Sequence, residues 1–356
     1  MNQSLPIAVI LASFGIAGAE EPQSPAYPEH QDLSYFLDDA GQKQPIRTAA
    51  DWEVRREHIL AGMQAAMGPL PKPKQNVPLG MKVIEETTIG SIRRQKVEYH
   101  TDSADRVVRA WLFIPKLEKG QKLPAILCLH QTTKIGKDEP AGLGGLPNLH
   151  YAKELAEHGY VTLAPDYPSF GEYEYDFAQH GYASGTMKAI FDNTRAIDLL
   201  QSLPQVDGQR LGCIGHSLGG HNTIFTTVLD TRIKAAVSCC GFTRFHKYYG
   251  GKLAGWTSSR YMPLIASRYE NNPDKAPFDF PELVAAIAPR AFLTVSPLHD
   301  GNFDVSGVKD SIAAAAPAFK LLGKESNLRA IYPDCGHDFP EAARKTAYAF
   351  LDEQLK

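Results

Sequence analysis

Cysteine is scarce in this chain of 356 residues, and its spacing follows no known framework. There are five cysteines, an odd number, and neither a CxxC pair nor an HExxH motif is present. Cys128 and Cys213 lie inside apolar runs typical of strands, while the neighbours Cys239 and Cys240 are poorly placed to bridge each other. These features argue against a disulfide scaffold and the common zinc sites, so we expect no metal and no cofactor. One bridge through Cys335 stays open if the protein is exported.

The chain also lacks a run of basic residues and an apolar segment long enough to span a bilayer. Its formal net charge is -3, which gives no electrostatic reason to expect nucleic acid as a partner. The apolar run at 5–19 is shorter than the roughly 20 residues that a membrane-spanning helix needs. It ends in Ala-Gly-Ala followed by two glutamates, which is typical of a signal-peptidase site, although the first four residues carry no Lys or Arg.

We therefore expect residues 1–19 to be an export signal that is removed from the mature protein. The protein would then be periplasmic or secreted, without stable membrane insertion. The alternative is a buried N-terminal strand or helix.

What is present is the composition of a globular protein, with 43% hydrophobic and 22% charged residues. Residues 20–80 read as an N-terminal extension. Its first part, 20–50, is rich in Pro, Gln, Asp and Glu and is predicted to run over the surface. Its second part, from Asp51 to Met67, has apolar residues at helical spacing and is followed by Gly-Pro, which predicts one amphipathic helix.

Residues 81–356 read as one α/β domain. Three alternating segments at 81–115 predict antiparallel strands. From residue 123 onward, apolar runs alternate with helical patterns. The predicted strands are 123–130, 160–167, 210–216, 233–240, 291–297 and 328–333, and the predicted helices are 149–159, 186–204, 217–229 and a last one from about 339. This alternation predicts a mostly parallel central sheet with helices on both faces.

One segment, at about 242–280, breaks this alternation. It belongs to a stretch of about 50 residues between two predicted strands, too long for a simple connection, and it is dense in aromatic and basic residues. We read it as an insertion over the carboxyl edge of the sheet, where α/β proteins bind ligands. The candidate substrate-binding residues are Tyr248, Trp256, Arg260 and Tyr261. The alternative is a capping subdomain whose aromatic residues form a small core of their own.

Gly215-His216-Ser217-Leu218-Gly219 is a G-x-S-x-G motif placed between a predicted strand and a predicted helix. A serine at such a turn is lifted above the sheet edge, and the flanking glycines leave room for the sharp bend. The amides at the start of the helix would point at a developing oxyanion. Ser217 is therefore the candidate nucleophile, and a structural serine at a helix start is the alternative.

A serine nucleophile needs a base and an acid, which follow it in the order acid, histidine in this arrangement. His337 lies between the last predicted strand and the last helix, where its loop returns to the nucleophile. His221 lies one helical turn after Ser217 and is poorly aimed. Asp300, next to a glycine after the strand 291–297, is the favoured acid. Asp304 is the other candidate, but it is better placed to cap the following helix.

An oxyanion hole requires two backbone N–H groups. One is predicted to be that of Leu218, immediately after the nucleophile. The other is predicted in the loop after the strand 123–130, at Gln131 or Thr132. His130 is expected to shape that turn rather than to take part in the chemistry.

At this point the chain resembles the α/β-hydrolases related to dienelactone hydrolases and acetyl xylan esterase-like proteins. The matching segments are CLHQTTKIGK, VTLAPDYPSFGEY, IGHSLGGHNTIF, IAPRAFLTVSPLHDGNFD and YPDCGHDFP. The resemblance implies a carboxylic-ester hydrolase with a triad of Ser217, Asp300 and His337. It differs from dienelactone hydrolases in having Ser217 instead of a cysteine, and from glucuronoyl esterases in having Leu218 instead of an arginine.

Three functions remain open from the sequence. The first is an esterase for small acyl groups that acts on small-molecule or carbohydrate esters such as acetylated carbohydrate, and an export signal fits polymeric substrates. The second is a peptidase that resembles the catalytic domain of prolyl oligopeptidase, although roughly 100 residues before the sheet cannot supply the propeller of those enzymes. The third is a binding protein of the same fold, which would have no need of an intact Ser, Asp and His. The sequence leaves the oligomeric state undetermined.

Overall fold

The structure, a computed structural model, describes residues 25–71, 77–179 and 181–356. The expected export signal at 1–19 lies outside these residues. Within the described part of the chain, no helix is both long enough and apolar enough to cross a membrane.

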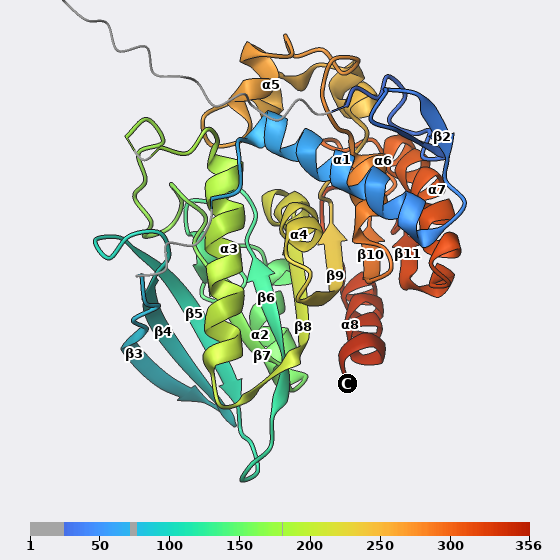
Figure 1. Ribbon diagram of the computed structural model, residues 1–356. Helices are drawn as coiled ribbons and strands as arrows, with labels where there is room; N and C mark the ends of the chain where they lie inside the picture. The colour runs from blue at the N-terminus through green and yellow to red at the C-terminus, as the bar shows by residue number, and fades with distance from the viewer. Residues whose placement is uncertain (1–24, 72–76, 180) are drawn as a thin grey trace, which may run out of the picture.

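A single mixed sheet organises the molecule. Nine of the strands in the described residues form it, in the order β11-β10-β9-β8-β6-β7-β5-β4-β3 (Figure 1). Their bounds are β3 Lys82–Ile89, β4 Ile92–His100, β5 Val107–Pro115, β6 Leu123–Leu129, β7 Val161–Pro165, β8 Val206–His216, β9 Ile233–Cys239, β10 Ala291–Val295 and β11 Leu328–Ile331. Strands β3, β4 and β5 pair antiparallel, and β6 to β11 pair parallel with one another. This is the architecture of the α/β-hydrolase fold, as expected.

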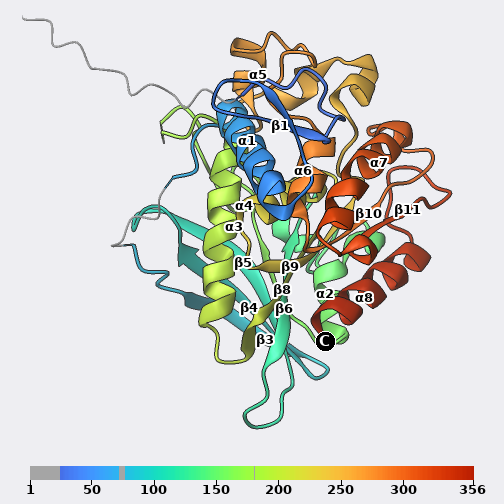
Figure 2. The same ribbon diagram turned by 45° about the vertical axis from the view of Figure 1, so that its right-hand side comes forward.

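Helices cover both faces of the sheet, because its central strands are apolar on both sides. Helices α2 (Tyr151–Glu157) and α8 (Glu341–Leu355) pack on one face. Helices α3 (Gly185–Ser202) and α4 (Leu218–Leu229) pack on the other, and Figure 2 shows α3 and α8 on opposite sides. The chain is completed by α7 (Val305–Leu321) and the short 3-10 turns η1 Gly136–Asp138, η2 Pro147–Leu149 and η5 Glu325–Asn327.

The N-terminal extension is more ordered than its composition predicts. Strands β1 (Tyr35–Leu37) and β2 (Lys43–Pro45) form an antiparallel hairpin, and nearby Tyr27, His30 and Leu33 are buried. Most of this part lies at the surface, and these buried side chains anchor it. The predicted helix is present as α1 (Ala49–Met67), capped at its start by Thr48 and followed by Gly68 with φ of 90°.

The insertion at 242–280 forms a layer of short helices above the sheet, drawn in orange at the top of Figure 1. It contains η3 (Phe245–Gly250), η4 (Leu253–Trp256) and α5 (Pro263–Ser267), and it leads into α6 (Phe280–Ile287). Its large apolar side chains join those of α1, α4, α6 and α7 in one buried cluster. The insertion is thus anchored by its own aromatic residues and by the N-terminal extension.

Candidate active site

Ser217 occupies the sharp turn between β8 and α4. Its backbone has φ of 53° and ψ of -115°, a conformation that is strained for a residue with a side chain. A Cβ on Gly215 would lie 2.3 Å from the Gly219 carbonyl oxygen, and one on Gly219 would lie 1.9 Å from that of Leu129. The two flanking glycines are therefore required for the turn to close against β6. The Ser217 N–H donates to the Cys239 carbonyl at 2.9 Å, which ties the turn to β9.

Asp300 and His337 meet at the same edge of the sheet. Asp300 lies in the loop after β10, and His337 lies in the loop between β11 and α8. The Nδ1 atom of His337 is 2.9 Å from each carboxylate oxygen of Asp300. The carboxylate also accepts hydrogen bonds from the N–H groups of Asn302 and Phe303, so it is held from two sides.

This pairing fixes the chemistry of the imidazole. A carboxylate accepts from Nδ1–H, so the Nε2 atom of His337 is the one available to take a proton. The His337 ring lies 4.7 Å, centroid to centroid, from the ring of His216, which is the residue before Ser217. The structure therefore brings Asp300, His337 and the Ser217 turn together.

The electrostatics of the pair favour a charged couple. Burial lowers the pKa of His337, but the hydrogen bond with Asp300, the Cys240 thiol and their charges raise it overall to about 9. Burial opposes ionisation of Asp300, yet the hydrogen bond from His337 and the backbone N–H groups bring the pKa of this carboxyl below its usual value. The site is thus built to stabilise an imidazolium.

Asp304 and His221, the alternative acid and histidine, have structural roles. Asp304 caps α7, since its carboxylate accepts from the Ser306 N–H at 2.8 Å. His221 is buried on α4 with its ring 4.9 Å from that of Trp256, and burial lowers the pKa of His221 to about 3. These roles agree with the sequence-based preference for Asp300 and His337.

The loop after β6 lies beside the Ser217 turn, as the oxyanion-hole prediction requires. Leu218 is the first residue of α4, so its N–H belongs to the free amides at the start of that helix. The Gln131 side chain donates to Glu139 at 3.1 Å, and the Thr132 hydroxyl lies 3.4 Å from that of Tyr261. The side chains of Gln131 and Thr132 thus contact other residues of the protein. Their backbone N–H groups remain the candidates for the second oxyanion donor.

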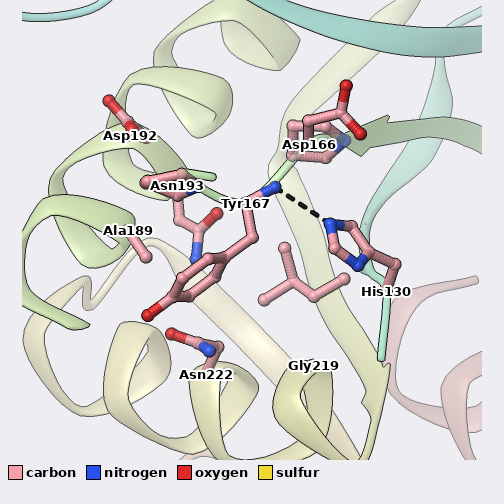
Figure 3. Close-up of a pocket in the computed structure, with 11 residues that line it drawn as sticks. His130, Asp166, Tyr167, Ala189, Asp192, Asn193, Gly219 and Asn222 are labelled. Carbon is pink, nitrogen blue, oxygen red and sulfur yellow. Dashed lines mark hydrogen bonds between the residues drawn. The ribbon is translucent and has the colours of Figure 1, made fainter. Parts of the chain in front are cut away.

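His130 shapes this loop through both ring nitrogens. Its Nε2 accepts from the Tyr167 N–H at 2.9 Å (Figure 3). This leaves Nδ1–H to donate to the Gln131 carbonyl at 2.6 Å. Burial lowers the pKa of His130 and keeps it neutral. The cavity drawn in Figure 3, between His130, Tyr167 and residues of α3 and α4, measures about 10 Å³. It has room for about one water and is too small for a substrate.

The predicted substrate-binding residues divide into two groups. Trp256 is only 3% exposed and packs against Phe245, Phe280 and Tyr248. The alternative reading, a private aromatic core, therefore describes Trp256 better than substrate contact does.

Arg260, Tyr261 and Tyr248 are half-buried. The Arg260 guanidinium lies 4.4 Å from the centre of the Phe170 ring and donates to the Ser169 hydroxyl at 2.8 Å. These side chains remain candidates for substrate contact.

Sequence reasoning missed two residues beside His337. Phe303 lies with its ring 6.1 Å from that of His337 and 6.0 Å from that of Trp256, so it connects the site to the insertion. Cys240 follows β9, has φ of 48° and is buried against the Asp300–His337 pair. Its place directly after a strand next to β8 was a signal that could have found it. All five cysteines, Cys335 included, are free thiols, so the bridge left open by the sequence is not present.

Sequence comparisons match this chain to known proteins. The model of the prolyl oligopeptidase family matches residues 148–356. The Bacillus subtilis protein "Putative hydrolase YtaP" is 28% identical over 258 residues, covering 69% of this chain and 83% of that protein. A Saccharomyces cerevisiae "Putative carboxymethylenebutenolidase", a dienelactone hydrolase by that name, is 35% identical over 25% of this chain and 36% of its own. The chain spans only 30% to 47% of four other curated relatives.

Solved structures show the same fold. A glucuronoyl esterase from Solibacter usitatus superposes with a TM-score of 0.68 at 19% identity, covering 94% of this chain and all of that one. A "putative acetyl xylan esterase" from Bacteroides fragilis has a TM-score of 0.61 at 19% identity, with coverage of 96% and 90%. These likenesses confirm the predicted fold.

Proposed function

The chain belongs to the prolyl oligopeptidase family, and from that premise we propose that it is a serine hydrolase that cleaves carboxylic esters through an acyl-enzyme. The observation that carries this proposal is the Asp300–His337 pair, held at 2.9 Å beside the strained turn of Ser217. A binding protein of this fold would have no need of a strained serine next to a histidine aligned by a carboxylate.

In the proposed mechanism, His337 Nε2 takes the proton of the Ser217 hydroxyl as Oγ attacks the ester carbonyl. Asp300 holds the resulting imidazolium. The oxyanion is stabilised by the N–H of Leu218 and by that of Gln131 or Thr132. His337 then protonates the leaving alcohol, and water attacks the acyl-enzyme by the same route in reverse. No step requires a group other than those of this chain and water.

We propose a small acyl group on a carbohydrate as the substrate class. The hydroxyl of Thr132, in the loop of the proposed oxyanion hole, lies 3.4 Å from that of Tyr261, and Arg260 precedes Tyr261 in the chain. Such groups suit a polar alcohol. A groove of about 440 Å³ is lined by Lys247, Tyr249 and Asn302 and reaches Asp300. The structural neighbours named for acetyl xylan and glucuronoyl esters support a carbohydrate ester.

Peptide hydrolysis is the second candidate, and the family assignment itself favours it. Amines are poorer leaving groups than alcohols, so a peptidase must position the leaving amine of its substrate well. The described residues before the sheet supply a hairpin and α1, and these pack on the insertion and α6. No feature of them points to a bound peptide, and we therefore rank the esterase first.

The experiment compares p-nitrophenyl acetate, acetylated xylo-oligosaccharides, methyl glucuronate esters and dipeptidyl p-nitroanilides, each with the full chain and with Ser217→Ala. We expect hydrolysis of the acetyl esters by the wild type and its loss in Ser217→Ala. Preference for the anilides would establish the peptidase instead. Turnover by Ser217→Ala equal to that of wild type would refute the serine mechanism.

Export is a separate proposal, supported by the apolar run and the Ala-Gly-Ala sequence before residue 20. Intact mass of the protein secreted by its native host decides it. We expect a mass that lacks residues 1–19, and a mass that includes Met1 would contradict the proposal.

A further inference from the structure

Three buried side chains gather behind His337, at the carboxyl ends of two neighbouring parallel strands. His216 ends β8 and pairs in register with Cys239, which ends β9, and Cys240 follows. All three are at most 1% exposed. The ligating atoms of the three, a ring nitrogen and two sulfurs, lie within 4.8 Å of one another. We call these residues the His216 cluster.

The histidine of this cluster has unused hydrogen-bonding capacity. Neither ring nitrogen of His216 has a hydrogen-bond partner among the described residues, although the ring is completely buried. Buried polar groups are rarely left unpaired, and each such case calls for an explanation. Each thiol makes a long contact with the Asp338 carbonyl, at 3.9 Å from Cys239 and 3.5 Å from Cys240. The two thiols also contact each other, and the Cys240 thiol contacts His337. The cluster therefore has two unpaired ring nitrogens and two weakly held sulfurs.

The geometry of the sulfurs matches a metal ion of a particular kind. The Sγ atoms of Cys239 and Cys240 are 3.7 Å apart. A tetrahedral Zn²⁺ with Zn–S bonds of about 2.3 Å places its two sulfurs about 3.8 Å apart. Thiolate and imidazole ligands select zinc-like and softer ions over Mg²⁺ and Ca²⁺, which prefer oxygen.

A fourth ligand is at hand in His337. A ring nitrogen of His337, the Cys240 sulfur and an oxygen of Asp300 form a second close group, again within 4.8 Å, which shares Cys240 with the first; the rings of His216 and His337 are 4.7 Å apart. The His337 side chain is 22% exposed, so an ion can enter from the side on which that ring faces solvent. His337 would complete a Cys₂His₂ set, the ligand set of many closed zinc sites.

We propose that the His216 cluster, with His337 as fourth ligand, binds one Zn²⁺-like ion, and that this ion inhibits the hydrolase. On binding, the two thiols release two protons to solvent. His216 and His337 each bind through the ring nitrogen that faces the cluster, and the proton of each neutral imidazole is then on its other nitrogen. The charges of the thiolates and of the ion cancel. While His337 is bound to the ion, it cannot take the proton of Ser217, so activity is lost until the ion is removed. The inhibitory part rests on the proposed function, whereas the binding part does not.

The experiment uses the full chain and two readouts. Co²⁺ is titrated into the protein, because tetrahedral thiolate-bound Co²⁺ absorbs visible light strongly and reports binding without any substrate. Zn²⁺ is then added to displace Co²⁺, and p-nitrophenyl acetate hydrolysis is measured before and after addition of a chelator. The variants are Cys239→Ser, Cys240→Ser and Asp300→Asn, with Cys335→Ser as the matched control because this thiol is the more exposed one and lies outside the cluster.

We expect one Co²⁺ per chain with thiolate absorption, displacement by one Zn²⁺, and loss of activity of about tenfold or more that the chelator reverses. Cys239→Ser and Cys240→Ser should each weaken binding by about tenfold or more. If one of the two fails to fold, the other still decides. Cys335→Ser and Asp300→Asn should bind Co²⁺ as the wild type does.

Three outcomes would overturn the proposal. Binding that survives in Cys239→Ser but is lost in Asp300→Asn would place the ion on Cys240, Asp300 and His337 instead. Inhibition by Zn²⁺, when bound Co²⁺ shows no thiolate absorption band, would show that the inhibitory ion binds outside the two cysteines. If the wild type with Co²⁺ shows no thiolate absorption, the proposed metal site does not exist, whether or not the protein hydrolyses esters.

Discussion

Asp300 and His337 are joined by two contacts of 2.9 Å, from the single Nδ1 atom of the histidine to both oxygens of the carboxylate. The Asp300 side chain is only 2% exposed, whereas that of His337 is 22% exposed. The pair thus has a buried end, the carboxylate, and a more open end, the imidazole that we propose as the base. The predictions for catalysis depend on this asymmetry.

The first prediction compares two aspartates four residues apart in one loop. Asp300→Asn should lower kcat for ester hydrolysis by about 10³- to 10⁴-fold, because an amide cannot hold the catalytic tautomer of His337. Asp304→Asn is the matched control and should change kcat by less than about threefold. It should also leave stability nearly unchanged, since Asn caps a helix about as well as Asp. Steady-state kinetics and thermal unfolding of both variants provide the measurement.

A reversed pattern, with activity lost in Asp304→Asn and kept in Asp300→Asn, would show that the acid is Asp304. Combining Ser217→Ala with His337→Ala offers a further check. The double variant should be no slower than either single one, because the residues act as one unit.

The second prediction concerns pH. The pKa of His337 is raised to about 9, and the base must be neutral to accept the proton of Ser217. The logarithm of kcat/KM should therefore rise with slope one at neutral pH and level off above about pH 9. Removing the Asp300 charge takes away the main cause of the raised pKa, so the residual activity of Asp300→Asn should level off at a lower pH. A wild-type profile already flat from pH 7 to 9 would contradict this account.

Most of the fold could be predicted from the sequence, because its signals are local. Apolar runs such as 123–130 and 210–216 correspond to β6 and β8, and the glycines around Ser217 identify the turn before α4. The order of Ser217, Asp300 and His337 also follows from topology, since parallel strands bring their following loops to one edge.

What could not be predicted depends on contacts between distant residues. Arg55 and Glu282 are 227 positions apart, and nothing near either one indicates the other. The burial of Tyr27, His30 and Leu33 in the N-terminal extension follows from such contacts rather than from its polar composition. The burial of Trp256 could not be predicted for the same reason, because its partners Phe245, Phe280 and Phe303 come together only in the folded chain.

The third prediction separates packing from substrate contact in the insertion. Trp256→Ala removes a side chain from the buried aromatic cluster and should cost about 3–5 kcal/mol of unfolding free energy, with similar losses on every substrate. Arg260→Ala, at a half-buried position, should raise KM for the preferred carbohydrate ester and change p-nitrophenyl acetate turnover much less. Both are measured by denaturant unfolding and by kinetics on the two substrates. A Trp256→Ala protein of unchanged stability and raised KM would restore the substrate-binding role.

The fourth prediction concerns the attachment of the N-terminal extension. Arg55 of α1 donates to Glu282 of α6 at 2.7 Å, and both side chains are at most 2% exposed. The Arg55 guanidinium also lies 3.1 Å from the centre of the Tyr27 ring, and His30 contacts the other Glu282 oxygen at 2.7 Å. Three segments of the protein, namely the stretch before β1, α1 and α6, therefore share one buried network.

Breaking this network from one side leaves a charge buried without its partner. Arg55→Met and Glu282→Leu should therefore each lower the unfolding free energy by about 3–5 kcal/mol. The double variant should lose less than the sum of the two single losses, because neither charge is then left behind. Glu53→Gln is the matched control, since its contact with Arg56 is at the surface and surface pairs contribute about 0–1 kcal/mol. Urea unfolding of the four proteins gives the coupling free energy, and additive losses in the double variant would show that Arg55 and Glu282 contribute independently.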